Sequence, residues 1–139
     1  MAILPESRAR VVFAALNMLV ALMLLVGVFG LIQPRFWALD IPAAALSAVE
    51  LVSAVALFAR LPWALRALSV SAWITFVGGL LLVGLTVLTM VFLRSVHGED
   101  GMVATAVSGL IVALLVPYTL LLPAAQLLWL KRQVGEPGR

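Results

Sequence analysis

Glu50 is the residue best suited to chemistry in this chain, because it lies alone at the centre of a long apolar run. The run Ile41–Ala59 (IPAAALSAVELVSAVALFA) has nineteen residues, a length that suits a membrane-spanning helix. A carboxyl group at bilayer depth is costly and by default indicates a functional site such as proton transfer or ion binding. Desolvation disfavours the carboxylate form, so we expect Glu50 to be protonated or to face a cation from a partner subunit.

Other polar side chains could share a site with this carboxyl group. Tyr118 and Thr119 lie near the middle of the apolar run Met102–Leu130, at nearly the same expected depth. Pro117 and Pro123 flank them, and each proline leaves a backbone carbonyl without its usual donor. Such interrupted helices occur at ion and substrate sites, although a proline also produces a simple kink. The candidate binding site comprises Glu50, Tyr118, Thr119, Asn17, Ser47 and Thr75.

The remaining residue types do not match known catalytic or metal sites. The chain has no cysteine and one histidine, His97, so it offers neither a thiolate nor a pair of histidines for a metal or haem. Glu99 and Asp100 lie near His97, but the glycines on either side of the two acids favour a turn that caps the next helix. We find no nucleotide-binding loop, nucleophile–histidine–acid set or redox motif, and no basic face for nucleic acid. We therefore expect no catalytic residue, metal, cofactor or nucleic-acid partner.

Composition places these polar residues in a membrane protein. The chain is 65% hydrophobic and only 11% charged, whereas a soluble domain has about 25% charged residues. Its apolar residues fall into four runs, at about 11–32, 41–59, 67–93 and 102–130. The first run is longer than the hydrophobic region of a signal peptide and no cleavage site follows it, so we expect a retained span. The predicted fold is an all-α integral membrane protein, a single up-down-up-down bundle of four transmembrane helices over residues 1–139.

Short polar segments join the predicted spans. They are Gln33–Asp40, Arg60–Arg66 and Arg94–Gly101. In the first segment, Asp40 can cap the second helix, with Pro42 in its first turn. The third and fourth spans would be about 40 Å long if they were helical throughout. Because a hydrocarbon core is only about 30 Å thick, we expect these two spans to tilt, kink or protrude.

Small and hydroxylic residues recur in every predicted span at steps of three and four. This spacing places them on one helix face, where they would let helices approach closely and exchange hydrogen bonds. The stripes are Ala14, Asn17 and Ala21; Ala43, Ser47, Glu50 and Ala54; Ser71, Thr75, Gly79, Leu82, Thr86 and Thr89; and Thr105, Ser108, Val112, Leu115, Thr119, Leu122 and Gln126. Helix packing explains such stripes, and the alternative is that they line a polar cavity around the carboxyl group.

Basic residues are distributed unequally between the flanks of the spans. Seven of the nine lie in the N-terminal leader, the second loop and the C-terminal tail, and two, Arg35 and Arg94, lie in the other loops. Lysine and arginine concentrate in cytoplasmic flanks, so we expect a multi-pass protein with both termini in the cytoplasm. The preference for arginine over lysine and the heavy use of alanine, leucine and valine suit a bacterial inner membrane protein.

Two functional hypotheses fit these features. The first is a non-enzymatic accessory, assembly or interaction subunit, a homo-oligomer or part of a larger membrane complex, in which Glu50 is an anchor. The second is a proton-coupled transporter or channel for an ion or small solute, in which Glu50 is the titrating site. A pore requires water along the face that carries Glu50, whereas an anchor requires that face to be packed.

Overall fold

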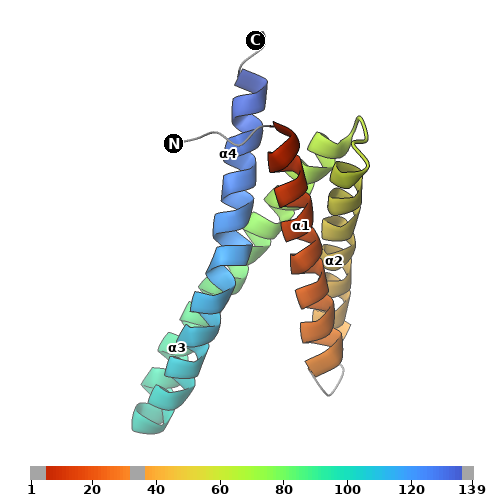
Figure 1. The fold of residues 1–139 in the computed structure, drawn as a ribbon. Helices are drawn as coiled ribbons and strands as arrows, with labels where there is room; N and C mark the ends of the chain where they lie inside the picture. The colour runs from red at the N-terminus through yellow and green to blue at the C-terminus, as the bar shows by residue number, and fades with distance from the viewer. Residues whose placement is uncertain (1–5, 32–36, 136–139) are drawn as a thin grey trace. The chain divides into compact units, whose positions relative to one another are not determined.

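A computed structural model describes residues 6–31 and 37–135, except the side chains of residues 31, 38–39, 97–101, 104 and 134–135 (Figure 1). The described part of the chain is helical apart from a turn at 59–63. The elements are α1 (Glu6–Leu25), η1 (Val26–Leu31), α2 (Trp37–Phe58), α3 (Ala64–Val116), η2 (Pro117–Leu121) and α4 (Leu122–Gly135). The two η elements are π-helical turns, in which each backbone hydrogen bond reaches one residue further than in an α-helix.

Four helical segments within the described residues are long and apolar enough to cross a membrane. They are Glu6–Gly30, Asp40–Phe58, Ala64–Val96 and Thr105–Gln133. This result confirms that the chain has four apolar helical segments long enough to cross a membrane. The first segment includes Glu6, and Arg10 forms an ion pair of 2.6 Å with Glu6 one turn before it. Such a pair stabilises an exposed helical turn that contains charged residues.

One sequence-based prediction about a helix end was wrong. Asp40 does not cap α2 but lies in its first turn, where a negative charge is still favourable at the positive end of the helix dipole. The segment 94–101, predicted to join the third and fourth spans, has helical backbone and belongs to α3. Arginine and glutamate favour helices about as strongly as leucine, so a polar segment can continue a helix that apolar residues began. In the predicted first loop, residues 33–36 lie outside the described residues.

The chain divides into two compact units. Unit 1 comprises Met1–Ser71 together with Trp129–Arg139, and unit 2 comprises Ala72–Leu128. Unit 1 therefore contains α1, α2, the start of α3 and the end of α4. Unit 2 contains most of α3, the η2 turn and the start of α4. The four-helix bundle inferred from the sequence remains a prediction, because it depends on how these units are joined.

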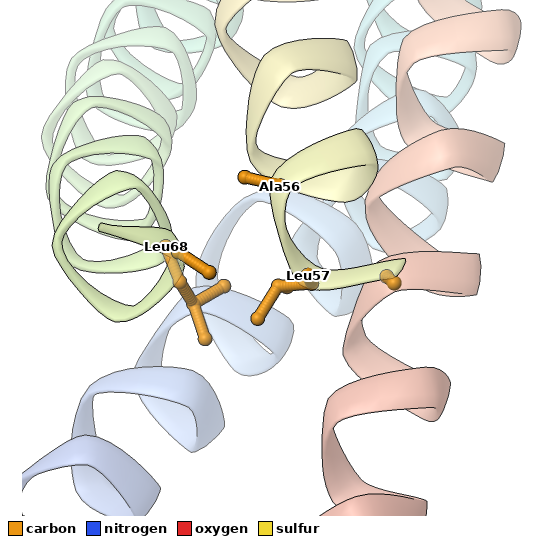
Figure 2. Packing of buried hydrophobic residues seen from close by; sticks show 5 residues of the cluster. Ala56, Leu57 and Leu68 are labelled. Carbon is orange, nitrogen blue, oxygen red and sulfur yellow. The ribbon is translucent and has the colours of Figure 1, made fainter. Parts of the chain in front are cut away.

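The apolar core of unit 1 surrounds the turn between α2 and α3. Its buried side chains are Ala14, Ala56, Leu57, Ala64 and Leu68, and Phe13, Leu61, Ala67, Trp129 and Leu130 pack against them. Figure 2 shows Leu57 and Leu68 extending toward each other from the end of α2 and the start of α3. The rings of Phe13 and Trp129 meet edge to face, with centroids 5.4 Å apart. This contact joins α1 to the C-terminal part of α4 within unit 1.

The end of α2 is a Schellman motif without a glycine. The Leu61 N–H donates to Ala56 O over 3.0 Å and the Arg60 N–H donates to Leu57 O over 3.3 Å, which is the bond pattern of that motif. Arg60 occupies the left-handed position, with φ of 54°. A non-glycine residue pays a conformational cost of about 1 kcal/mol there. Pro62 follows directly and, having no N–H, cannot continue the helix.

Unit 2 contains a helical hairpin, although the helical assignment of α3 is continuous. A Cβ atom placed on Gly79 would lie 2.6 Å from Thr119 O, and one placed on Gly109 would lie 3.4 Å from the Met90 side chain. Gly79 and Thr119 would be separated by about 60 Å along a straight helix. The chain therefore reverses direction between Met90 and Gly109, as the far end of α3 in Figure 1 shows.

The first arm of this hairpin is the part of α3 before the reversal, and the second arm is the rest of α3 with η2 and the start of α4. The sequence predicted the packed face of the second arm better than that of the first. In the second arm, the predicted stripe is the less exposed face, because Thr105, Ser108, Val112, Leu115, Thr119 and Leu122 are half-buried and Gln126 is buried. In the first arm, Thr75 and Gly79 are buried as predicted, but Leu82 and Thr89 are exposed. Their neighbours Val83 and Met90 are half-buried instead. Beyond Gly79 the predicted stripe is therefore only partly the less exposed face, since Thr86 alone of its remaining residues is half-buried.

The prolines of the fourth span widen the helix but do not interrupt it. Pro117 begins the η2 turn, and its carbonyl oxygen accepts a hydrogen bond from the Leu122 N–H. Pro123 follows in α4 and is fully buried. In a π-helical turn each backbone N–H bonds to a carbonyl one residue further back, so the helix can continue although Pro117 has no N–H to donate. The expected interruption at mid-span is therefore a local π-turn.

Candidate functional site

Glu50 lies on a continuous buried face of α2. Its side chain is 3% exposed, and Ala43, Ser47, Ser53, Ala54 and Leu57 on the same side of the helix are all buried. Positions three and four residues apart share a face of an α-helix, which explains why these residues are excluded together. Glu50 is also engaged in an interaction within the chain. The carboxyl group thus belongs to a packed face rather than to an open surface.

The facing helix α1 contributes a buried amide to this interface. Asn17 is 1% exposed, and Ala14 and Ala21, one turn away on either side, are fully buried. This confirms the predicted stripe of the first span as a packing face. Asn17 Nδ2 donates a hydrogen bond of 3.2 Å to Ser53 Oγ on α2. Small side chains at this crossing permit the close approach that such a short polar contact needs.

Ser53 is the residue of this polar interface that the sequence reasoning missed. It is fully buried, receives the Asn17 hydrogen bond, and lies three residues after Glu50. The predicted stripe of α2 proceeded from Glu50 to Ala54 and so passed over it. A step of three places a residue on the same face as a step of four, and a serine at that step was the signal that could have identified Ser53.

Ser47, also a predicted site residue, is satisfied within its own helix. Its hydroxyl donates to Ala43 O over 2.7 Å, and the side chain is 1% exposed. Its hydroxyl hydrogen is therefore used one turn away, although its oxygen can still accept. We call the set Asn17, Ser47, Glu50 and Ser53 the α1–α2 polar face. All four of its residues belong to unit 1.

The other predicted site residues belong to unit 2. Thr75 is 4% exposed, and Tyr118 and Thr119 are half-buried in the η2 turn. The Thr119 hydroxyl donates to Leu115 O over 3.0 Å, so it too is satisfied one turn back in the helix. Since these three residues and the α1–α2 polar face lie in different units, a single site that joins them to Glu50 stays a prediction.

Several hydroxyls of α3 bond within their own helix, not across an interface. Thr86 donates to Leu82 O over 2.8 Å, and Thr89 donates to Leu85 O over 2.9 Å. Serine and threonine side chains often satisfy themselves in this way in apolar surroundings. These two threonines therefore use their hydroxyl hydrogens within their own helix, one turn back. Their helix face can contact an apolar environment without leaving a polar group unpaired.

An open groove lies on unit 1, between α2 and the first turns of α3. Its volume is about 420 Å³. Ala48, Val49 and Val52 line it from α2, Ala67 and Val70 line it from α3, and Trp63 and Arg66 lie at the end nearest the turn. Its walls are apolar even at Arg66, which contributes its aliphatic stem. We call this feature the α2–α3 groove.

The described side chains contain no group of three histidine, aspartate or glutamate residues that could hold a metal ion. The cluster at residues 97–100 lies outside the described side chains, so its predicted role as a turn and cap is not tested. Comparisons with protein-family models, with curated proteins and with solved structures find no match for this chain. What the described site offers is a carboxyl, an amide and two hydroxyls packed between helices, an arrangement that suits a structural contact better than a reaction.

Proposed function

We propose that this chain is a non-enzymatic interaction subunit of a bacterial inner membrane. In this proposal its four apolar helical segments cross the bilayer, both termini lie in the cytoplasm, and the protein assembles with copies of itself or with a larger membrane complex. Glu50 acts as an internal anchor that fixes α1 against α2. The unequal distribution of lysine and arginine supports the orientation, and the length and hydropathy of the segments support insertion.

The observation that carries this proposal is the packing around Glu50. The side chains on its face are buried, and Ser53 is bonded to Asn17 across the interface. A conduction pathway requires a hydrated surface beside its titrating group, and the α1–α2 polar face is instead filled by protein. Packed polar groups between transmembrane helices hold those helices together at modest energies. The role of an anchor therefore agrees with the surroundings of this carboxyl better than that of a transport site.

The low burial of the later segments supports assembly. In the most apolar stretch of each segment, 39% of the residues are buried in Asp40–Phe58, 6% in Ala64–Val96 and none in Thr105–Gln133. Few side chains of these last two segments are therefore buried, and the large apolar ones are mostly exposed or half-buried. Lipid and the helices of other subunits both suit such a surface. In this proposal the exposed apolar side chains of Ala64–Val96 and Thr105–Gln133 provide the surface for partners, and the α1–α2 polar face maintains the chain's own fold.

The test compares Glu50→Gln with Glu50→Leu. Glutamine keeps the size and the hydrogen-bonding capacity of a protonated glutamate, so we expect Glu50→Gln to change the free energy of unfolding by less than about 1 kcal/mol. Leucine leaves buried polar groups unsatisfied and should destabilise the protein by about 1–3 kcal/mol. The mass of the complex purified in mild detergent, measured by light scattering, should be the same for wild type and Glu50→Gln. Asp40→Asn, in the first turn of α2, where the side chain is half-buried, is the control for loss of a carboxyl group.

Proteoliposome flux separates this proposal from the transport alternative. A subunit that uses Glu50 as an anchor shows no proton-driven flux in either form. A pH-driven flux that Glu50→Gln abolishes and Asp40→Asn leaves intact would establish the proton-coupled transporter instead. A purified chain that is monomeric in every mild detergent, with no partner and no flux, would reject the role of an interaction subunit.

A further inference from the structure

The α2–α3 groove has the properties of a site for an elongated apolar group. Its volume of about 420 Å³ falls within the range of roughly 300–1,000 Å³ that holds small organic ligands. Val52 and Val70 on its walls are 53% and 55% exposed, so the groove is open along its side. An open apolar groove without polar anchoring groups along its length cannot orient a hydrophilic solute. Its occupant must be apolar where it contacts Ala48, Val52 and Val70.

The lining of the groove lies within one leaflet of a bilayer. Its residues run from Trp63 to Val70 at the start of α3 and from Ala48 to Val52 along α2. At 1.5 Å per residue the longer of these runs is about 10 Å, which is less than half of a hydrocarbon core of about 30 Å. Trp63 lies at the shallow end, and tryptophan is enriched at the boundary between hydrocarbon and headgroups. The groove can therefore hold the part of an acyl chain that is nearest to its headgroup.

The shallow end of the groove carries a positive charge without a protein counter-charge. Arg66 is exposed, and no ion pair or hydrogen bond of its guanidinium is present among the described residues. The chain contains no acidic residue between Glu50 and Glu99. Arg66 also lies in the first turn of α3, where the helix dipole disfavours a cation and favours an anion. An anionic group bound at this end would satisfy the arginine and the helix terminus together.

We propose that the α2–α3 groove binds one anionic phospholipid, with an acyl chain along Ala48, Val52 and Val70 and the phosphate group on Arg66. This inference rests on the membrane insertion proposed above, which supplies both the lipid and the depth. The anionic surface of a cytoplasmic leaflet attracts each nearby arginine by about 1 kcal/mol, equivalent to roughly a fivefold preference. The proposal differs from general lipid contact in requiring this one groove and this one guanidinium.

A cross-linking experiment identifies the occupant. The chain has no cysteine, so Val52→Cys and Val55→Cys each provide a unique attachment point for a benzophenone probe. Both valines are about equally exposed on α2, at 53% and 54%, but only Val52 lines the groove. Each protein is placed in vesicles of equal amounts of phosphatidylglycerol and phosphatidylcholine, illuminated, and analysed by mass spectrometry. We expect a roughly fivefold excess of phosphatidylglycerol adducts at position 52 and no excess at position 55.

Charge variants then test the role of the guanidinium. Arg66→Gln should abolish the excess at position 52, whereas Arg94→Gln, which removes an exposed arginine outside the groove, should leave it unchanged. An equal excess at both valines, no excess at either, or an adduct between two protein chains at position 52 would overturn the proposal. Carbonate extraction distinguishes a failure of the lipid site from a failure of the proposed membrane insertion. If carbonate releases the wild-type protein from vesicles and no lipid adduct forms at either valine, membrane insertion is wrong and the lipid site is rejected with it.

Discussion

Asn17 Nδ2 on α1 lies 3.2 Å from Ser53 Oγ on α2 and donates a hydrogen bond to it, with both side chains excluded from solvent. This bond joins two helices that are adjacent in sequence, so it fixes the register of the first hairpin. Ser53 follows Glu50 on the same helix face. The environment of the carboxyl group therefore depends on whether this amide and hydroxyl remain paired.

A double-mutant cycle measures the strength of the pair. We expect a coupling free energy of about 0.6 kcal/mol between Asn17→Ala and Ser53→Ala, the average for hydrogen bonds between transmembrane helices. Asn17→Ala should cost more than Ser53→Ala, because Asn17 makes a further interaction within the chain. Unfolding by steric trapping in mild detergent gives the four free energies. The cycle of Asn17→Ala with Ser95→Ala, whose hydroxyl bonds to Phe92 O, should show no coupling.

Gly79 is the position at which a single methyl group should disrupt unit 2. A Cβ atom there would lie 2.6 Å from Thr119 O and 2.7 Å from Thr119 Cβ, and backbone atoms cannot move away cheaply. We expect Gly79→Ala to destabilise the protein by about 1–3 kcal/mol, as overpacking of a tight interface does. A methyl group on the adjacent Gly78 would meet no atom within 4 Å, so Gly78→Ala is the control. Equal stabilities of the two variants would show that the α3 hairpin does not close at Thr119.

Arg60 is a position at which stability can be gained. Glycine adopts the left-handed conformation without the steric cost that a side chain incurs, so Arg60→Gly should stabilise the protein by about 1 kcal/mol. Arg60→Ala removes the same charge but retains the Cβ atom, and it should give no such gain. Thermal unfolding in detergent compares the three proteins. A similar gain from both variants would attribute the effect to charge and not to backbone conformation.

The edge-to-face pair of Phe13 and Trp129 should contribute more than its buried area. Aromatic pairs of this geometry are worth about 0.5–1.5 kcal/mol beyond area burial. Trp129→Leu should therefore lower the free energy of unfolding by at least about 1 kcal/mol. Trp73 also contacts a phenylalanine, Phe76, but is 55% exposed, so Trp73→Leu should change stability by less than about 0.5 kcal/mol. Loss of stability in the second variant alone would contradict the assigned core of unit 1.

The sequence predicted the number of apolar helices because length and hydropathy determine that property. It also predicted the packed faces of α1 and α2, since Asn17 and Glu50 are the most polar residues of their runs and small residues flank them. It did not predict Ser53. Steps of three and four residues are both compatible with one helix face, and only the position of the neighbouring helix decides between Ser53 and Ala54.

Backbone features were harder to predict than packed faces. The left-handed conformation of Arg60 could not be predicted, because glycine, the residue that usually marks this position of a Schellman motif, is absent. The hydrogen bonds of the motif come from the backbone N–H groups of Arg60 and Leu61 and do not depend on their side chains. The π-turn at Pro117 was expected as an interruption, since a missing donor is visible in the sequence but the compensating bond is not. The candidate site was predicted as one cluster, whereas its residues divide between two units whose boundary no local pattern marks.

The order of segments along the chain has a consequence for how the protein can be altered. Unit 1 is discontinuous: Met1–Ser71 and Trp129–Arg139 lie on either side of unit 2 in the sequence, and the contact between Phe13 and Trp129 joins them. Unit 2 is thus an insertion whose two covalent junctions both enter the same unit. Its length and surface can change without moving either junction. This arrangement places the α1–α2 polar face and the hairpin of unit 2 in parts of the sequence that can vary separately.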